Sequence, residues 1–163
     1  MSEHRELQKN QSIDGRFIIH QLAGSGGMGE VYKAHDLRTL APVAIKVLRT
    51  DVARDSAFLA RFRREAQSAA GLNHAAIVAV YDSGVDGDVP YLVMEFLSGA
   101  DLDERLAKHG PLPQHVVVAY LLQVCEAMAE AHAAGIVHRD LKPGNLFLAR
   151  TNAGNERIKV LDF

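Results

Sequence analysis

The segment His138-Arg-Asp140-Leu-Lys142-Pro-Gly-Asn145 gathers three chemically useful side chains within eight residues. Asp140 offers a carboxylate that can accept a proton from a hydroxyl group. Lys142 offers a cation that can neutralise a phosphoryl group in transfer. Asn145 offers an amide oxygen suited to a hard metal ion. This combination indicates a loop suited to phosphoryl chemistry.

The elements around this segment fall into two regimes that divide near Leu97 to Ala100. Before the division, short β-type runs bounded by Gly, Asp and Pro predict five strands, at Phe17–Leu22, Glu30–His35, Pro42–Leu48, Ile77–Tyr81 and Pro90–Phe96. One helix interrupts them, from about Ser56 to about Ala70. After the division the sequence predicts two helices and then two strands, at Leu102–His109, Pro113–Ala134, Leu146–Ala149 and Ile158–Leu161.

A glycine-rich motif lies between the first two predicted strands: Gly24-Ser-Gly26-Gly-Met-Gly29-Glu-Val31. Because a strand is predicted on each side, the glycines would form the turn of a hairpin and not the start of a helix. Glycine allows the backbone to approach phosphate oxygens without Cβ atoms in the way. By itself the motif is equally consistent with an ordinary glycine-rich hairpin turn.

A lysine and a glutamate in this half of the chain are candidates for an ion pair. In the run Val43-Ala-Ile-Lys46, strand alternation puts Ala44 and Lys46 on one face. Glu65 falls on one face of the following helix with Phe62 and Ala69, so it is an acid within an apolar stripe. A carboxylate in that position is costly without a partner, and Lys46 is the available cation. The alternative is a lysine extended into solvent and a glutamate at the boundary of the core.

The composition excludes several classes of protein. Hydrophobic residues make up 48% of the chain and charged residues 23%, which is typical of a globular domain and not of a disordered chain. The formal net charge is −2, and the isoelectric point near 6.4 does not favour a nucleic-acid-binding surface. The single cysteine, Cys125, cannot form an internal disulfide. The eight histidines show no spacing typical of metal ligands.

Taken together, the chain resembles the eukaryotic-type (Hanks-type) serine/threonine protein kinases, most closely their bacterial branch. The resemblance rests on four motifs in the family's order: G-x-G-x-x-G-x-V from Gly24, V-A-I-K from Val43, H-R-D-L-K-P-x-N from His138, and Asp162-Phe163. It implies an α+β, protein-kinase-like fold, with an antiparallel five-stranded small lobe carrying one helix and the start of a mainly helical large lobe. The expected boundaries are a tail at residues 1–12, the small lobe at 13–97 and the first part of the large lobe at 98–163.

The resemblance also implies roles for individual residues. Asp140 would be the catalytic base, Lys142 would contact the γ-phosphate, Lys46 would pair the α- and β-phosphates, and Glu65 would hold Lys46 in place. Asn145 and Asp162 would hold Mg²⁺, or Mn²⁺ in its place. His138 and Phe163 would stack inside the fold. The residues expected around ATP are Gly24, Ser25, Gly26, Gly27, Gly29, Val31, Ala44, Lys46, Met94, Glu95, Leu97, Asp101 and Phe147.

The family's pattern continues past Phe163 with the glycine of the D-F-G motif, an activation loop and further helices. We therefore expect the N-terminal part of a kinase domain, with weak or no transfer activity by itself. The implied partners are ATP and a protein substrate with a serine or threonine hydroxyl, with no nucleic acid and no membrane-spanning segment in this chain. We expect a cytoplasmic location.

Two other functions are consistent with the same residues. One is a non-catalytic ATP-binding regulatory module that uses the nucleotide site alone. The other is an interaction module that associates with itself or a partner through the long predicted helix. We expect that helix to expose an apolar stripe along Val117, Leu121, Val124 and Met128, or the residues flanking them.

Overall fold

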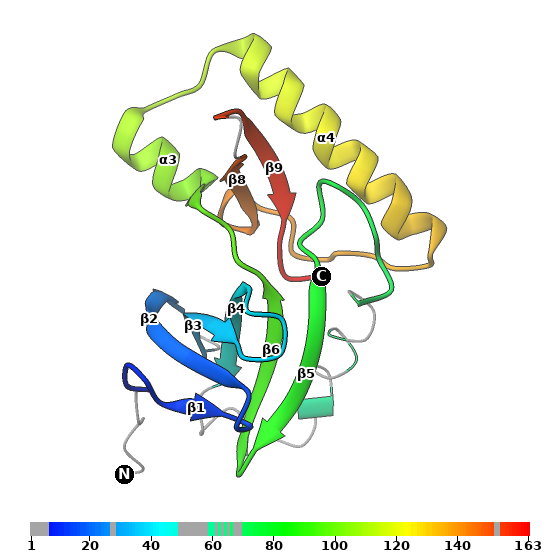
Figure 1. Cartoon of the computed structure of the whole chain (residues 1–163). Coiled ribbons are helices and arrows are strands. Elements are labelled where there is room, and N and C mark those ends of the chain that lie inside the picture. The colour runs from blue at the N-terminus through cyan, green and yellow to red at the C-terminus, as the bar shows by residue number, and fades with distance from the viewer. Residues whose placement is uncertain are drawn as a thin grey trace. The chain divides into compact units, whose positions relative to one another are not determined.

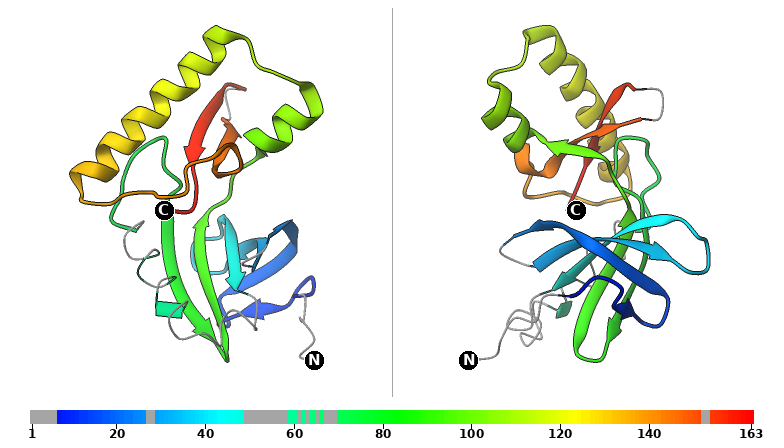
Figure 2. Two further views of the ribbon diagram at one scale, coloured as in Figure 1. Left: turned by 180° about the vertical axis from the view of Figure 1, so that it is seen from behind. Right: turned by 60° about the vertical axis from the view of Figure 1, so that its left-hand side comes forward.

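The computed structural model describes residues 7–26, 29–48, 59–60, 62, 64, 66, 70–151 and 154–163 (Figure 1). The chain forms two compact units. The first consists of Met1–Gln67 and Val80–Phe96, and the second of Ser68–Ala79 and Leu97–Phe163. Figure 2 shows the strands of the first unit and the helices α3 (Leu102–His109) and α4 (Gln114–Ala133) of the second from two further directions.

The first unit is built on an antiparallel sheet of six strands in the order β1-β2-β3-β4-β6-β5. The strands are β1 Ser12–Ile13, β2 Phe17–Ser25, β3 Gly29–Asp36, β4 Pro42–Leu48, β5 Val80–Asp86 and β6 Val89–Glu95. The five-stranded sheet of the sequence analysis is therefore present, with one short strand added at its edge. Of the predicted helix at about 56–70, the described positions are helical, and the others, including Glu65, lie outside the described residues.

One face of this sheet carries the hydrophobic core of the unit. The predicted alternation in β4 is confirmed, because Val43, Ile45 and Val47 are all buried in that core. Its other members are Ile13, Phe17, Ile19, Tyr32, Ala34, Tyr91 and Val93. Burying these apolar side chains on one face leaves the opposite face of the same strands available for a site.

The residues before β1 extend the sheet, although the sequence analysis placed them in a tail. The Asn10 amide donates a hydrogen bond to the Ile19 carbonyl (2.8 Å), and the Ile19 amide donates one to the Gln11 carbonyl (2.9 Å). Farther upstream, the Leu7 amide donates to the Tyr32 hydroxyl (3.0 Å), and Leu7 packs against the core. These residues carry little hydrophobic pattern, so their backbone pairing could not be predicted from the sequence.

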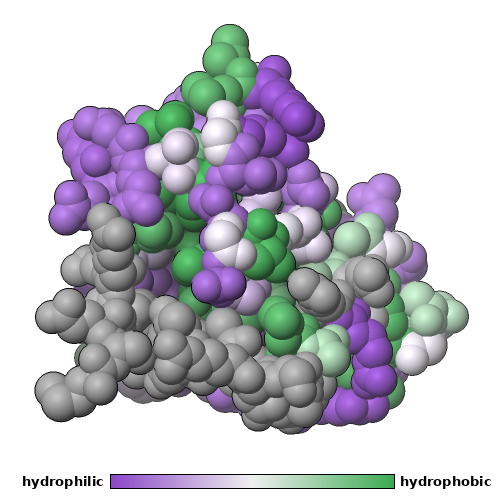
Figure 3. All heavy atoms as spheres, turned by 90° about the horizontal axis from the view of Figure 1, so that it is seen from below, coloured by the Kyte–Doolittle hydropathy of each residue, from purple (hydrophilic) through white to green (hydrophobic). Residues whose placement is uncertain are grey.

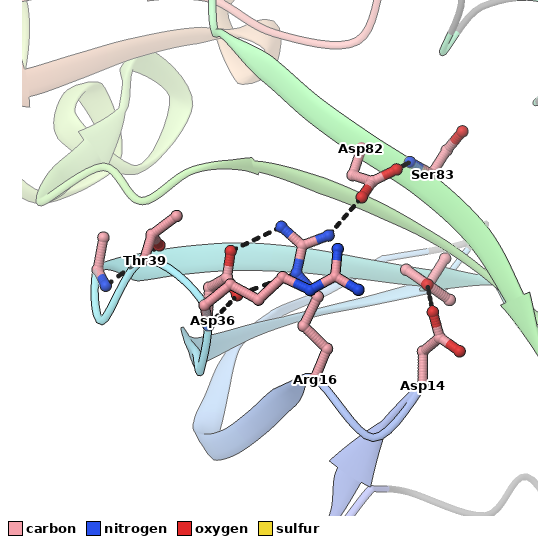
Figure 4. Close-up of polar contacts among 9 residues, drawn as sticks. Asp14, Arg16, Asp36, Thr39, Asp82 and Ser83 are labelled. Carbon is pink, nitrogen blue, oxygen red and sulfur yellow. Dashed lines mark hydrogen bonds and ion pairs between the residues drawn. The ribbon is translucent and has the colours of Figure 1, made fainter.

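An ion-pair network links the turn before β2 to strands β3 and β5 of the first unit (Figure 4). The Arg16 guanidinium donates two hydrogen bonds to Asp36, at 3.0 and 2.7 Å, and one to Asp82, at 2.6 Å. Asp36 is buried, and the Arg16 guanidinium lowers the pKa of its carboxyl from 3.8 to about 2. Nearby, the Tyr91 hydroxyl donates to Asp14 (2.9 Å), and burial raises the pKa of this tyrosine to about 12.

The second unit combines a three-stranded antiparallel sheet with two helices. The sheet has the order β7-β8-β9, with β7 at Gly99–Asp101, β8 at Leu146–Arg150 and β9 at Glu156–Val160. The helices are α3, Leu102–His109, and α4, Gln114–Ala133, and a single 3₁₀ turn, η1, covers Pro143–Asn145. The predicted helices and the last two predicted strands are confirmed to within a few residues.

One predicted strand was misplaced. The run Ile77–Tyr81 splits between the units, because β5 begins only at Val80 and Ile77 forms a parallel bridge with Val160. The Val78 amide donates to the Val160 carbonyl (3.0 Å), and the Lys159 ammonium donates to the Ile77 carbonyl (3.2 Å). These long-range bonds anchor residues 76–78 to β9, which a local β-propensity cannot reveal.

Helix α4 leaves part of its apolar surface uncovered. Of the predicted stripe, Val124 is buried, whereas Val117 and Leu121 are exposed together with the flanking Val118 and Leu122. The expected apolar patch is therefore present on this helix. Figure 3 shows hydrophobic and hydrophilic residues interspersed on the face of the molecule seen from below.

Among the described residues, α4 is the one helix that is long and apolar enough to cross a membrane by length and composition alone. Two side chains of α4 bind β9: the Tyr120 hydroxyl donates to Glu156 (2.9 Å), and the Gln123 side-chain oxygen accepts from the Ile158 amide (3.1 Å). A helix packed within a water-soluble fold can satisfy the same length and composition criteria.

Candidate functional site

The glycine motif forms the tip of the β2–β3 hairpin. Gly24 and Ser25 are the last residues of β2, and Gly29 is the first of β3. The Gly26 amide donates to the Gly29 carbonyl (2.9 Å), which closes the turn. Gly27 lies outside the described residues. The prediction that these glycines connect two antiparallel strands is confirmed, so their amides are concentrated in one loop.

The glycines of this hairpin differ in what surrounds them. A Cβ at Gly29 would lie 2.1 Å from the Val47 carbonyl oxygen, so only glycine fits beside β4. At Gly24 and Gly26 a Cβ would have no neighbour within 4 Å. Gly29 is thus required by the packing of the sheet, whereas the other two glycines leave open space above the loop.

The strand register brings several of the predicted nucleotide-binding residues onto one face of the sheet. Val31 is opposite Lys46, and Ala44 is opposite Met94. Residues paired across antiparallel strands share a face, and this face lies opposite the core. We call it the site face; its members are Val31, Lys33, Ala44, Lys46, Leu92 and Met94. The predicted partner of Lys46, Glu65, lies outside the described residues.

The residues expected to contact the adenine edge and the ribose belong to different units. Glu95 ends β6 in the first unit, whereas Leu97 and Asp101 belong to the second. Asp101 caps helix α3, because its carboxylate accepts a hydrogen bond from the Glu104 amide (2.8 Å). It is also the β-sheet partner of Phe147, so these two predicted site residues are neighbours.

The catalytic segment of the second unit folds so that its three chemical groups converge. The Lys142 ammonium donates to the Asp140 carboxylate (2.8 Å). The Asn145 amide nitrogen donates both to the Asp140 carbonyl (2.8 Å) and to its carboxylate (3.1 Å). Asn145 is buried, whereas Asp140 and Lys142 are exposed. A rigid buried amide therefore orients an accessible carboxylate beside an accessible cation.

The charges of this segment reinforce one another. The hydrogen bond from Lys142 lowers the pKa of Asp140 below its usual value of 3.8, and Asn145 acts in the same direction. The same contact raises the pKa of Lys142 above 10.5, with smaller contributions from Asp162 and Asp103. Asp140 is therefore an ionised acceptor, and Lys142 a cation, at neutral pH.

His138 connects the catalytic segment to the end of the chain. One ring nitrogen, Nε2, is 2.7 Å from the Leu161 carbonyl, and the other, Nδ1, accepts from the Asp140 amide (3.3 Å). Its ring also contacts the ring of Phe163, with centroids 4.9 Å apart. The contact expected between His138 and Phe163 is confirmed.

The backbone on both sides of this connection is unusual. Arg139 and Asp162 adopt positive φ angles of 66° and 54°, which residues other than glycine rarely do. Such conformations persist when the surrounding structure enforces them, and they concentrate at functional sites. Here one of them, Arg139, directly precedes the predicted catalytic base Asp140, and the other is the predicted metal ligand Asp162 itself.

The residues expected to hold a divalent metal ion are chemically suited to it. Asn145 donates to Asp140 twice through its amide nitrogen, which turns its amide oxygen away from Asp140. That oxygen and the Asp162 carboxylate are hard donors of the kind that Mg²⁺ prefers. Among the described residues there is no cluster of three His, Cys, Asp or Glu side chains that would form a separate metal centre.

Sequence reasoning missed two residues of the site face, Lys33 and Leu92. The Lys33 ammonium lies over the ring of Phe96, 4.7 Å from its centroid. Lys33 is two residues after Val31, so strand alternation was a signal that could have placed it on the same face. Its aromatic partner, however, directly follows β6, which is not a neighbour of β3 in the sheet.

Comparison with known proteins gives a consistent result. Residues 17–163 match the protein kinase domain family. The chain is 47% identical over 161 residues to a probable serine/threonine-protein kinase of Streptomyces coelicolor, covering 96% of this chain and 23% of that protein. It is 45% identical over 155 residues to the serine/threonine-protein kinase PknB of Mycobacterium leprae, covering 93% and 24%.

Solved structures agree with these relatives. The kinase domain of Mycobacterium tuberculosis PknI superposes with a TM-score of 0.86 at 32% identity, covering 97% of this chain and 63% of that domain. The chain thus spans about a quarter of the length of the two curated relatives and less than two thirds of the solved kinase domain.

Proposed function

This chain belongs to the protein kinase family, and we propose that it forms the nucleotide-binding part and the catalytic loop of a serine/threonine kinase. The reaction would transfer the γ-phosphoryl group of ATP to a serine or threonine hydroxyl of a protein. The observation that carries this proposal is the convergence of Lys142 and Asn145 on the Asp140 carboxylate. That arrangement supplies a proton acceptor and a cation within one loop.

The proposed step has a simple balance of bonds and protons. The bond between the γ-phosphorus and the oxygen that bridges it to the β-phosphate breaks, and a bond from the substrate hydroxyl oxygen to the γ-phosphorus forms. Asp140 would accept the proton that the hydroxyl loses. Lys142 would neutralise charge on the transferred group, and its raised pKa supports that role because the cation persists at neutral pH.

Residues within each unit have a proposed role in nucleotide binding. In the first unit, the backbone of the glycine hairpin would face the phosphates, Lys46 would pair with them, and Val31, Ala44 and Met94 would contact the base. The Glu95 carbonyl would accept a hydrogen bond from the base. In the second unit, the proposed nucleotide contacts are Leu97, Asp101 and Phe147. Placement of Val31, Ala44, Lys46 and Met94 on the site face supports this assignment.

We propose that Asn145 and Asp162 hold Mg²⁺, with Mn²⁺ able to replace it. When bound, the ion would offset the negative charge of the ATP phosphates. This chain would supply two oxygen donors, the Asn145 amide oxygen and the Asp162 carboxylate, and keep them in position. The bonds from Asn145 to Asp140 and from His138 to Leu161 support such a role, because they fix the residues around both donors. A cytoplasmic location and association through the exposed face of α4 stay predictions.

The proposal is tested by measuring ATP binding and phosphoryl transfer separately. Binding of Mg-ATP is measured by the shift in melting temperature of the chain, and transfer by the labelling of a generic protein acceptor with γ-labelled ATP. This chain and the same chain extended by the remaining part of a kinase domain are compared, each unchanged and as its Asp140→Asn variant. Asp88→Asn, an exposed aspartate remote in sequence, is the matched control.

We expect Mg-ATP to raise the melting temperature of the chain and of both variants. Labelling by the extended protein should fall at least 100-fold in Asp140→Asn and stay unchanged in Asp88→Asn. Equal labelling in Asp140→Asn would contradict the catalytic role. ATP binding without transfer, even in the extended protein, would favour a non-catalytic ATP-binding module. No binding at millimolar Mg-ATP would refute the nucleotide site altogether.

A further inference from the structure

Lys33 makes a contact that none of the roles above explains. Its ammonium group lies over the ring of Phe96, 4.7 Å from the centroid, within the range in which a cation is attracted to an aromatic face. Lys33 is in the middle of β3, and Phe96 is the last residue of the first unit after β6. Both side chains are half-buried, so solvent only partly screens the attraction.

The sheet order shows what lies between the two residues. Strand β4 separates β3 from β6, and Lys33 is opposite Ala44, which in turn is opposite Met94. These three side chains form a row across the site face. Ala44 is only 6% exposed although it points away from the core, because its small side chain lies between two longer ones. The Lys33 side chain therefore runs beside the surface proposed to contact the base.

Phe96 lies directly after the end of strand β6. Its neighbours are Glu95, whose carbonyl is proposed to bond the base, and Leu97, which is also a proposed nucleotide contact. Past Glu95 the chain has left β6, so ladder hydrogen bonds no longer fix the main chain there. A side-chain contact on Phe96 is thus a means of holding this connecting segment against the sheet.

We propose that Lys33 is a positioning residue for the nucleotide base: its cation on the Phe96 ring holds the segment that carries the base-binding backbone groups. This inference rests on the proposed function, because it assumes that the site face binds a nucleotide. It assigns Lys33 no contact with the phosphates. Its effect should therefore depend on the base of the ligand and on the presence of the aromatic ring.

The test is a double-mutant cycle read out by ligand affinity. Lys33→Met removes the charge and keeps the apolar stem, Lys33→Arg keeps the charge, and Phe96→Leu removes the aromatic face. Lys9→Met, at an exposed lysine of the same unit, is the matched control. Dissociation constants are measured by calorimetry for Mg-ATP and for Mg-tripolyphosphate, which has no base.

We expect Lys33→Met and Phe96→Leu each to weaken Mg-ATP about three- to fivefold, and the double variant to be no weaker than either single one. Lys33→Arg should bind within about twofold of the unchanged chain. Tripolyphosphate should bind all variants equally. Unfolding by urea checks that each variant is folded, and Lys33→Gln replaces Lys33→Met if that variant is not.

Three results would overturn the inference while leaving the proposed function intact. They are unchanged Mg-ATP affinity in Lys33→Met, additive losses in the double variant, and an equal loss of tripolyphosphate affinity, which would indicate a phosphate contact instead. If the unchanged chain binds no Mg-ATP, the proposed function fails and this inference fails with it.

Discussion

The His138 ring donates a hydrogen bond to the Leu161 carbonyl over 2.7 Å. A carbonyl can only accept, so Nε2 carries the proton, and Nδ1 is then free to accept from the Asp140 amide, as observed at 3.3 Å. A neutral imidazole with this tautomer satisfies both bonds at once. Through it, the position of the loop that carries Asp140 is coupled to the residue immediately before Asp162.

Replacing His138 should therefore loosen two segments together. His138→Phe keeps a ring that can pack on Phe163 but loses both hydrogen bonds. We expect the free energy of unfolding to fall by about 1–2 kcal/mol, because the Leu161 carbonyl would lose its partner. Urea unfolding measures the change, and His109→Phe, at an exposed histidine on α3, is the control. Equal stability of His138→Phe and the unchanged chain would show that the bonds contribute nothing.

The glycines of the β2–β3 hairpin should separate into two groups on substitution. Gly29→Ala places a Cβ 2.1 Å from the Val47 carbonyl oxygen, and we expect a loss of about 1–3 kcal/mol in the free energy of unfolding. Gly24→Ala and Gly26→Ala meet no atom within 4 Å, so the stability should change little while Mg-ATP affinity falls. Thermal melts with and without Mg-ATP distinguish the groups. Equal destabilisation by all three would contradict this division.

Loss of the Lys142 cation should reduce transfer by a factor that does not depend on pH between 6 and 9. The pKa of Asp140 is below 3.8 beside Lys142, and without that partner it would rise only toward that value. The pKa of Lys142 is above 10.5, so the lysine stays charged over the same range. We expect Lys142→Met to lower kcat/KM about 100-fold at every pH in that interval.

This pH profile is measured on the extended kinase domain, with Lys108→Met on helix α3 as the control. If the loss in Lys142→Met grew as the pH fell toward 6, Asp140 protonation would have to be part of the effect. That result would mean that the lysine acts chiefly by keeping the carboxylate ionised, and not on the transferred group.

The pair between Arg16 and Asp36 should make the first unit sensitive to acid. The pKa of Asp36 is about 2 in the folded chain and 3.8 when unperturbed, so the carboxylate contributes stability above pH 3.8 and loses it as the pH falls toward 2. We expect Asp36→Asn to lower the free energy of unfolding at pH 7 by about 1 kcal/mol, since solvent at Arg16 weakens the pair.

The difference between Asp36→Asn and the unchanged chain should shrink between pH 3.8 and 2. Urea unfolding at pH 7, 3 and 2 tests this, with Asp88→Asn as a control for loss of one exposed charge. A difference that stayed constant over that range would show that Asp36 acts by shape or hydrogen bonding and not by its charge.

Much of the fold was predictable because local patterns and local chemistry agreed. Alternation in Val43-Ala-Ile-Lys46 correctly separated the core residues from Lys46, and the strand on each side of the glycine motif correctly predicted a hairpin. In the second unit, the spacing of Asp140, Lys142 and Asn145 within eight residues was enough to predict that they act together. Short sequence separation leaves few ways for such groups to be arranged.

What could not be predicted depends on contacts between distant residues. The bond from Arg16 to Asp82 spans 66 positions, and the anchoring of residues 76–78 depends on β9, about 80 positions later. The contact of Lys33 with Phe96 requires the sheet order β3-β4-β6, in which β5 is bypassed. Periodicity reports which side of a strand is buried, but it does not report which strands are adjacent.

The pairing of Asn10 and Gln11 with Ile19 has a consequence for how this chain behaves in solution. An uncovered outer strand offers its amides and carbonyls to any other strand, and so promotes edge-to-edge aggregation. Here the upstream residues occupy the Ile19 backbone groups, and the Leu7 amide is tied to a buried tyrosine. A shortened chain that began at residue 13 would keep every motif of the proposed nucleotide site. It would also leave the Ile19 backbone groups of β2 open to pairing with a strand of another molecule.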